Sequence, residues 1–261
     1  MINSLWISKT GMEAQQTQLD VISHNLANVS TTGFKRSNAV FEDLIYQNLR
    51  QVGANNTEAE QLPTGLQLGL GVRTVATSRQ FSQGSLQLTD NHFDVAINGN
   101  GFFNIQLPDG TVGYTRDGSF EVDSQGRLVT SNGLAVANGI TIPAEHAVGE
   151  HQRDRHRARD AAGQHRAADG GHASPCPPSS TRPGLEPRGQ NIFTETAASG
   201  QPQGGTPGTN GLGIMRQGYL ETSNVNVVQE LVTMIQTQRA YEMNSKAVQT
   251  SDQMLQKLAQ L

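Results

Sequence analysis

The chain has 261 residues, of which 35% are hydrophobic and 5% aromatic, and its formal net charge is −4. That length is enough for two domains, but the apolar content is low for a single large core, so an elongated or multi-part body is expected. The small net charge gives no reason to expect nucleic acid or an anionic membrane as the main partner.

The first predicted element is an amphipathic helix over residues 3–28, which contain no proline. A strict seven-residue apolar repeat runs along it, and Ile22 widens the resulting stripe. Such a repeat puts one apolar stripe on a slightly under-wound helix, and that stripe needs a partner helix. We expect this part of the core coiled-coil domain, residues 1–33, to end at Gly33, which can take the left-handed conformation of a helix C-cap. The repeat consists of Leu5, Met12, Leu19 and Leu26.

A linking segment is predicted over residues 34–66. Its part from about Gln47 to Leu62 is polar and weakly patterned, which by itself indicates a loop. A loop of this length in a compact protein is usually functional or disordered. Composition does not show its role.

A β domain is predicted over residues 67–145, because the apolar period changes there from that of a helix to that of a strand. Short β-rich runs alternate with turn signals such as Asn98-Gly-Asn-Gly and Pro108-Asp-Gly-Thr. Turns at intervals of roughly eight to twelve residues are typical of an antiparallel sandwich or barrel.

Residues 146–182 differ from the rest of the chain. They hold five of the seven histidines and the only cysteine, Cys176, whereas Val148 is their only aliphatic or aromatic side chain larger than alanine and proline. Because so little apolar surface cannot order a segment, we predict disorder. The alternative hypothesis is a shifted reading frame, since codons exist for which the next frame of residues 151–156 encodes an alternating strand. The nucleotide sequence tests this hypothesis, which fails if no alternative frame encodes such a strand.

Catalytic and ligand-binding sites are not expected. His146, His151 and His156 recur every five residues, and neither a helix nor a strand puts that spacing on one face, so no metal site is predicted. The arginines of the same segment are largely offset by acidic residues and lack aromatic neighbours for stacking on bases. His24 has no paired nucleophile, and Cys176 lies in Pro-Cys-Pro-Pro. We therefore predict neither enzymatic activity nor a cofactor.

Residues 183–222 are expected to return the chain to its helical part, residues 223–261. The last predicted helix runs from Val227 to Leu258 and is capped by Asn226. At 1.5 Å per residue it would be roughly 48 Å long, so it must lie against another elongated surface. A second seven-residue apolar repeat runs along this helix, with Leu231 at helical spacing beside it. The repeat consists of Val227, Met234, Tyr241, Val248 and Leu255.

The two apolar repeats predict an α+β fold in which long N- and C-terminal helices pair as a coiled coil and flank an antiparallel β domain. The helices can pair within one chain or between copies. Their amide-rich flanking faces favour assembly, because amides bury against neighbouring copies at a lower desolvation cost than Lys or Glu. Two function hypotheses follow: a structural subunit of a polymer, or a soluble coiled-coil binding or adhesin-like module.

Targeting signals are missing from the sequence. No stretch approaches the roughly 18 apolar residues that cross a bilayer. The first ten residues lack the basic start, apolar run and cleavage site of a secretory signal peptide. These features predict a cytoplasmic protein, or one exported by a route that cleaves no signal. With a single cysteine, an internal disulfide is excluded.

Four ordered segments are similar to motifs of the bacterial flagellar rod and hook family. The first is Asp20-Val-Ile-Ser-His-Asn-Leu-Ala-Asn-Val-Ser-Thr-Thr-Gly-Phe-Lys; the others occupy residues 94–103, 114–120 and 223–246. The resemblance covers about residues 1–144 and 183–261. The motif positions singled out are Asn25, Asn28, Gly33, Phe34, Gly99, Gly101 and Asn224.

This resemblance implies a structural subunit of the basal-body distal rod, a stiff helical tube that transmits torque to the hook and carries the export channel. The terminal helices are then expected to line the inner wall, and the polar insert at about residues 46–65 resembles a distal-rod feature that locks neighbouring subunits. The implied partners are further copies of the chain, proximal rod and hook subunits, the surrounding peptidoglycan and outer-membrane ring proteins, and the flagellar type III export apparatus. The implied location is the periplasm-spanning distal rod, reached without a cleaved signal peptide.

Overall fold

The computed structural model describes residues 2–50, 64–137, 173–174, 184–200, 207–208 and 212–259. The chain forms two units, each with its own internal contacts. The helical unit comprises Met1–Ala27, Ser37–Gln80 and Val225–Leu261, and the β unit comprises Asn28–Arg36 and Phe81–Asn224. The predictions of disorder or a shifted frame for residues 146–182 lie outside the described residues, except at 173–174.

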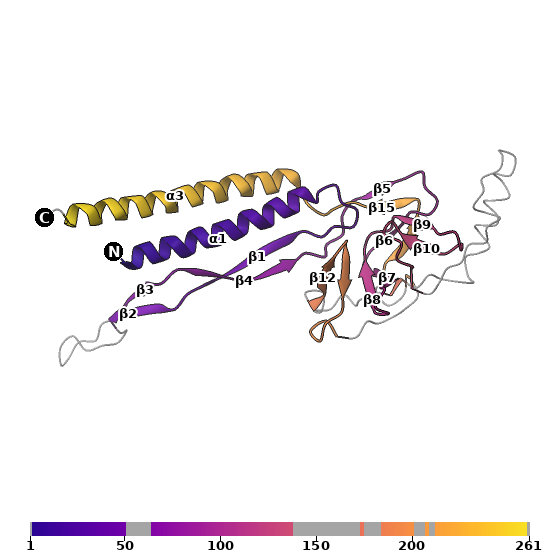
Figure 1. Ribbon diagram of the computed structural model, residues 1–261, viewed down its shortest axis with the longest axis horizontal. Coiled ribbons are helices and arrows are strands. Elements are labelled where there is room, and N and C mark those ends of the chain that lie inside the picture. The colour runs from indigo at the N-terminus through magenta and orange to yellow at the C-terminus, as the bar shows by residue number, and fades with distance from the viewer. Residues whose placement is uncertain are drawn as a thin grey trace. The chain divides into compact units, whose positions relative to one another are not determined.

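The helical unit is built on two long helices, α1 (Ile2–Ala27) and α3 (Val227–Ala259). They lie side by side and antiparallel, with the two chain ends at the same end of the pair (Figure 1). The side-chain oxygen of Asn226 accepts hydrogen bonds from the backbone N–H groups of Val228 and Gln229, at 3.0 and 3.3 Å, so the predicted N-cap is confirmed. The pairing of the terminal helices is confirmed as well. Neither described helix has an apolar stretch long enough to cross a membrane.

Two antiparallel strand pairs complete the helical unit. Strand β1 (Ser37–Asp43) pairs with β4 (Val72–Arg79), and both strands contact α1. Strand β2 (Tyr46–Arg50) pairs with β3 (Leu66–Gly69). Part of the segment expected to be a loop is therefore a strand. Every residue of β2 is exposed, so burial imposes no alternation on its sequence, and alternation is the signal by which a strand is recognised.

The β unit contains several small antiparallel sheets, in place of the expected sandwich or barrel. The largest has the strand order β11-β7-β8-β13-β12. Three two-stranded pairs, β9 with β10, β6 with β14 and β5 with β15, accompany it. Most strands have only three to five residues, because glycine-containing turns end them early. The strands are β5 (Leu86–Leu88), β6 (Val95–Asn98), β7 (Phe102–Gln106), β8 (Val112–Thr115), β9 (Phe120–Val122), β10 (Leu128–Thr130), β11 (Ala173–Ser174), β12 (Glu186–Gly189), β13 (Ile192–Thr194), β14 (Ile214–Gln217) and β15 (Tyr219–Glu221).

Two adjacent phenylalanines of β7 divide the core of the β unit. Successive side chains of a strand point to opposite faces, so Phe102 and Phe103 enter different clusters. Phe103 packs edge-on against Phe120, with 5.1 Å between ring centroids, and Phe102 packs against Phe193 at 5.9 Å. Strand β7 thereby connects both clusters and is the centre of the fold of this unit.

Candidate assembly surfaces

Two contacts between α1 and α3 involve small and polar residues. A Cβ built on Gly11 would lie 2.9 Å from Nδ2 of Asn244, so the glycine allows the two helices to approach closely there. Nearer the other end of the pair, Nδ2 of Asn25 lies 3.5 Å from Oε2 of Glu230, and each of these residues is only 1% exposed. Sequence reasoning missed this polar contact because it followed the apolar positions.

The predicted apolar repeats lie beside this polar contact. In α1, Ile22 is 1% exposed, and the four repeat positions are partly buried. In α3, Met234 and Val248 are partly buried, whereas the other four predicted positions are 36% to 42% exposed. Their part in assembly stays a prediction. The exposed four are Val227, Leu231, Tyr241 and Leu255.

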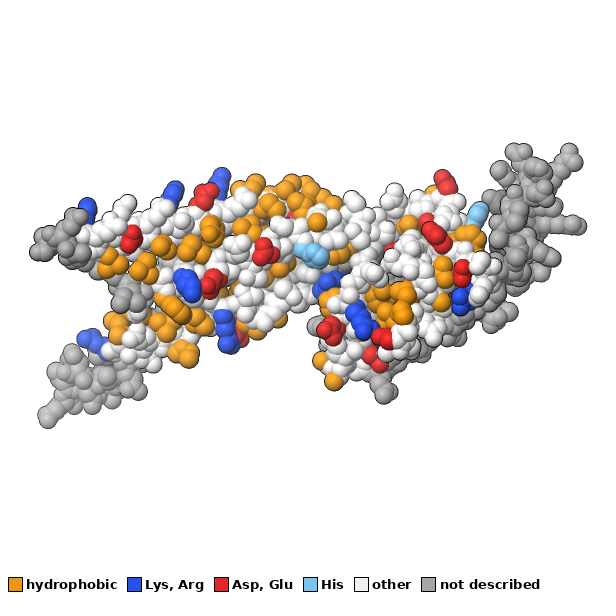
Figure 2. Space-filling model, in the orientation of Figure 1, with side chains coloured by type: hydrophobic (Ala, Val, Ile, Leu, Met, Phe, Trp, Pro, Cys, Tyr) orange, Lys and Arg blue, Asp and Glu red, His pale blue; other side chains and the backbone are white. Residues whose placement is uncertain are grey.

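The N-terminal half of α3 carries an apolar stripe that its own chain leaves exposed. Val228, Leu231, Val232 and Ile235 have the i, i+3, i+4, i+7 spacing of one helix face, and their exposed fractions are 71%, 42%, 50% and 51%. At 3.6 residues per turn, this face points away from the buried Glu230. Figure 2 shows apolar side chains gathered over this part of the helix. We call these four residues the outer stripe; only Leu231 was among the positions predicted from the sequence.

The strand pair β2–β3 exposes a second set of apolar side chains. Leu49 is 55%, Leu66 52% and Leu68 43% exposed, and Tyr46 at the start of β2 is 51% exposed. A two-stranded hairpin is marginally stable alone, and exposed strand edges invite pairing. The helical unit therefore presents apolar surface on its strands as well as on α3.

Asn25 holds the end of α1 against the start of β1. Its Nδ2 donates to the carbonyl oxygen of Ser37 at 2.8 Å, and its Oδ1 accepts from the N–H of Ser37 at 2.9 Å. A side-chain amide carries a donor and an acceptor on separate atoms, so it can satisfy a backbone acceptor and a backbone donor at the same time. This explains an asparagine at the motif position.

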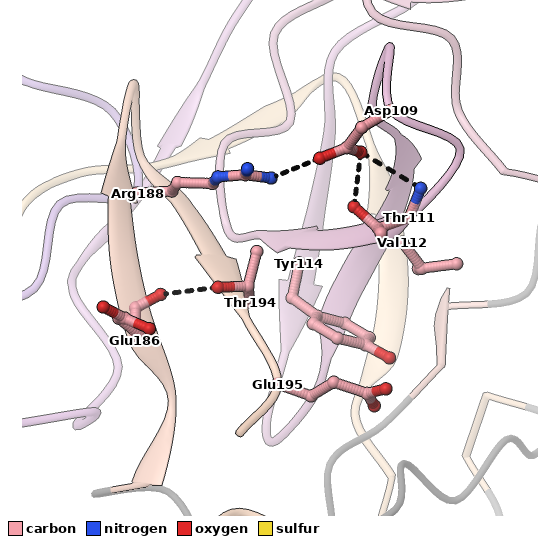
Figure 3. A pocket seen from close by; sticks show the side chains of 8 residues that line it. All are labelled: Asp109, Thr111, Val112, Tyr114, Glu186, Arg188, Thr194 and Glu195. Carbon is pink, nitrogen blue, oxygen red and sulfur yellow. Dashed lines mark hydrogen bonds and ion pairs between the residues drawn. The ribbon is translucent and has the colours of Figure 1, made fainter. Parts of the chain in front are cut away.

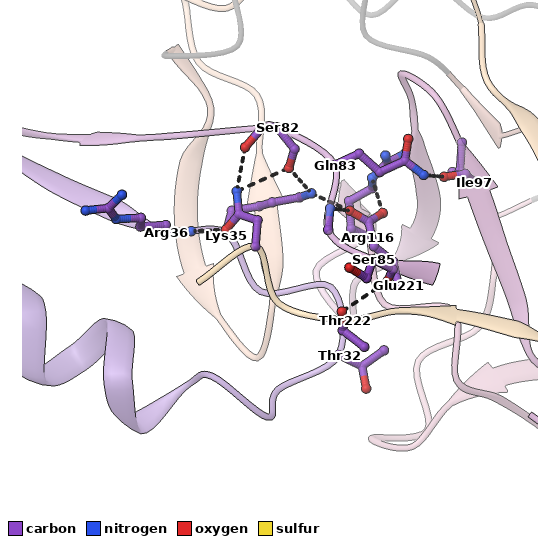
Figure 4. A network of polar contacts seen from close by, with 12 residues as sticks. Thr32, Lys35, Arg36, Ser82, Gln83, Ser85, Ile97, Arg116, Glu221 and Thr222 are labelled. Carbon is purple, nitrogen blue, oxygen red and sulfur yellow. Dashed lines mark hydrogen bonds and ion pairs between the residues drawn. The ribbon is translucent and has the colours of Figure 1, made fainter. Parts of the chain in front are cut away.

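In the β unit, the quoted motifs converge on one buried carboxylate (Figure 4). Glu221 is 1% exposed and contacts Nζ of Lys35 at 2.5 Å through Oε1, and Nε of Arg116 at 3.0 Å through Oε2. Its Oε1 also accepts from the N–H of Gly84 at 2.9 Å. Lys35 donates further to the carbonyl of Ser82 at 2.8 Å. We call Lys35, Arg116 and Glu221 the buried ion cluster.

Arg116 connects the cluster to the glycine-rich turn after β6. Its Nη2 donates to the carbonyl of Gly99 at 2.6 Å and its Nη1 to that of Gly101 at 2.7 Å. Gly33 lies against the backbone of Arg116 with φ +69°, so its predicted left-handed conformation is confirmed. A Cβ there would lie 2.7 Å from the carbonyl carbon of Arg116, which excludes a larger residue without a shift.

The remaining motif residues hold the same region. Oδ1 of Asn224 accepts from the N–H of Arg36 at 2.7 Å, and its Nδ2 donates to Ser82, so it joins two segments distant in sequence. Phe34 is 3% exposed. Asn28 accepts from the N–H and the hydroxyl of Thr31 in the turn after α1, both at 3.2 Å. These motif residues therefore have conformational and packing roles within the β unit.

A cleft of about 770 Å³ opens on the five-stranded sheet of the β unit (Figure 3). Asp109 accepts hydrogen bonds from the hydroxyl and N–H of Thr111, at 2.5 and 3.1 Å, and from Arg188 at 2.8 Å. The hydroxyl of Thr111, Arg188 and the Thr111 N–H together lower the pKa of Asp109 to about 2. These contacts tie the β7–β8 turn to β12.

Within the described ranges, no three or more His, Cys, Asp and Glu side chains are grouped as a metal site. The histidines at 146, 151 and 156 lie outside those ranges, so the structure does not test whether they bind a metal.

Comparison with known proteins gives three family models in chain order. Residues 6–35 match the model of the flagella basal body rod protein, and residues 96–152 match the D1 domain of the flagellar hook protein FlgE/F/G. Residues 216–261 match the C-terminal model of the flagellar basal body rod FlgEFG proteins. The first and last models cover most of both terminal helices.

Curated relatives are similar over nearly their full length. The chain is 56% identical to the flagellar basal-body rod protein FlgG of Buchnera aphidicola subsp. Schizaphis graminum, with 100% of each chain covered. It is 45% identical to FlgG of Borreliella burgdorferi, over 98% of this chain and 97% of the relative. It is 35% identical to FlgG of Bacillus subtilis, over 100% and 99%.

Proposed function

The chain belongs to the family of flagellar basal-body rod proteins, which are structural proteins, and we propose that it is a subunit of the distal rod, polymerising into a stiff helical tube. The tube transmits torque to the hook and encloses the export channel. The protein is located in the flagellar basal-body rod. Closed or helical assemblies of identical chains need surface patches that are complementary between copies.

The outer stripe of α3 is the observation that carries this proposal. Fully burying a Val, Leu or Ile side chain stabilises by about 1.5–3 kcal/mol, so covering four half-exposed side chains contributes on the order of 4 kcal/mol per subunit. A surface helix of a monomeric protein normally turns such a stripe toward its own core. Here the stripe is on the face opposite the contact with α1, which supports coverage by another subunit.

Charge substitution in the outer stripe tests the proposal. Val232→Lys or Ile235→Lys places a cation on an exposed face, so the helix pair stays folded in the single chain while burial between copies becomes unfavourable. We expect the variant to sediment as a monomer at concentrations at which the unchanged chain forms rods or fibres, and to fail in restoring motility to cells that lack the gene.

A matched control comes from the same helix. Gln253 is exposed in the C-terminal half of α3, where the outer face is polar, so Gln253→Lys adds the same charge without crossing the outer stripe. We expect this variant to assemble. Assembly and motility retained in Val232→Lys and Ile235→Lys would refute the role of the stripe. A chain that stays monomeric without any substitution favours the alternative function, a coiled-coil binding module.

The further partners are also part of the proposal. A distal-rod subunit meets proximal rod and hook subunits at the ends of its segment, and the peptidoglycan and outer-membrane ring proteins around it. It reaches its place through the flagellar type III export apparatus. Family membership supports these partners, and crosslinking of purified basal bodies followed by mass spectrometry tests each contact.

A further inference from the structure

The contact between α1 and α3 repeats along the pair. Gly11 lies against Asn244, and Asn25 lies against Glu230. The two contacts are two heptads apart on both helices, which fixes the antiparallel alignment. The same alignment places Gln18 opposite Thr237 between them.

Each of these heptad positions holds a small or polar residue, and none holds a large apolar one. Thr237 is 6% exposed, and Gln18, Asn244 and Ser251 are partly buried. We call the set the polar ladder: Ser4, Gly11, Gln18 and Asn25 of α1, and Ser251, Asn244, Thr237 and Glu230 of α3.

The apolar repeats beside the ladder cannot select one alignment of the helices. Their members recur every seven residues, so sliding one helix by a heptad brings similar side chains back into contact. A polar ladder behaves differently. A slip by one heptad sets Asn244 against Gln18 or Ser4 in place of Gly11, and moves Asn25 away from Glu230. Each buried polar group that loses its partner costs about 1–3 kcal/mol.

We propose that the polar ladder specifies the antiparallel register of the terminal helices. Polar residues at single heptad positions select register and partner number in coiled coils, at a cost in stability. The register in turn sets which residues of α3 face outward, and so where the outer stripe lies along the helix pair. The inference concerns the single chain and stands independently of the proposed assembly.

Spin labels at two exposed lysines measure the register directly. Lys9 and Lys246 lie near the Gly11–Asn244 contact along the pair, outside the ladder. In the full chain with Cys176→Ser, Lys9→Cys and Lys246→Cys carry the labels, and labelled chain is diluted in unlabelled chain. Double electron–electron resonance then reports intramolecular distances. We expect one narrow distance when the ladder is intact.

Two variants disturb the ladder in different ways. Replacing Gln18, Thr237 and Asn244 by leucine removes its middle, and we expect a second, longer distance. A slip by one heptad offsets the two labels by about 10 Å along the helix axis, at 1.5 Å per residue, and this offset adds at right angles to their separation across the pair. Gly11→Asn alone sets two asparagines against each other and is expected to give the same displaced population. Adding Asn244→Gly to Gly11→Asn restores the glycine–asparagine pair, and the single distance should return.

The control substitutes leucine at the exposed, off-ladder positions Gln16, Gln249 and Gln253, and it should keep the single distance. The proposal is overturned if the leucine ladder variant or Gly11→Asn keeps that single distance, or if the unchanged chain already gives several. The double variant Gly11→Asn with Asn244→Gly distinguishes a change of register from misfolding. It carries both substitutions but restores the glycine–asparagine contact, so a misfolded chain would not return to the single distance.

Discussion

Glu221→Gln probes the buried ion cluster with an almost unchanged shape. The glutamine keeps the volume and one carbonyl oxygen of the glutamate but removes the negative charge that Lys35 and Arg116 both contact, at 2.5 and 3.0 Å. The side chains of these two cations are 1% and 4% exposed. Water therefore cannot solvate the charge that the substitution leaves behind.

The size of the effect follows from that burial. Removing one partner of a buried ion pair destabilises by about 3–5 kcal/mol, because the other charge remains in a low-dielectric surrounding. Whole domains are stable by only about 5–15 kcal/mol. In a unit of this size, roughly 2–4 °C of melting temperature corresponds to 1 kcal/mol, so we expect a loss of about 10 °C.

Hydrogen exchange measured by mass spectrometry gives the local readout. The amides of β7 lie in the core of the β unit, and a loss of about 3–5 kcal/mol accelerates their exchange roughly 100- to 4,000-fold when exchange reports the opening equilibrium. Glu195→Gln removes an exposed carboxylate of the same unit and should change exchange less than about threefold, since surface substitutions stay within about 0.5 kcal/mol. A Glu221→Gln chain whose β7 amides exchange like those of the Glu195 control would refute the reasoning.

Two further predictions concern single side chains of the β unit. The pKa of Asp109 is lowered to about 2, so the stability that its contacts contribute is present above the ordinary carboxyl pKa near 4 and is lost as pH falls through about 2. Arg188→Gln should raise the pKa of Asp109 toward its ordinary value in a carboxyl-carbon nuclear magnetic resonance titration, and an unchanged titration would contradict the assigned cause. Gly33→Ala places a Cβ at φ +69° against the backbone of Arg116 and should lower the free energy of unfolding in urea by more than about 1 kcal/mol. A midpoint equal to that of the unchanged chain would show that the turn relaxes.

The two helices were predictable because their signals are local. The heptad repeats, the absence of proline and the Asn226 cap lie within the segments that they describe, and the observed helices begin and end within two residues of the predicted bounds. The left-handed Gly33 followed from residue type alone. Strand β2 was not predictable in this way, because a strand exposed on both faces has no required alternation.

The sequence did not predict which face of each helix contacts the other helix. The apolar repeats identify an amphipathic helix, but several of their members in α3 are exposed, and the direct contact with α1 belongs to the polar ladder. Both sets recur every seven residues, so periodicity by itself does not say which of them faces the partner. The contacts of Gly11 with Asn244 and of Asn25 with Glu230 in the folded pair distinguish them.

The sequence by itself determined the terminal helices, the Asn226 cap of α3 and the motifs that identify the family, because these features depend on neighbouring residues. Tertiary structure alone decided what the motifs do. Lys35, Arg116 and Glu221 come from distant parts of the chain, and no local pattern marks them as partners. A buried charge must find a counter-charge wherever the fold can bring one, and the free energy of that encounter depends on long-range packing.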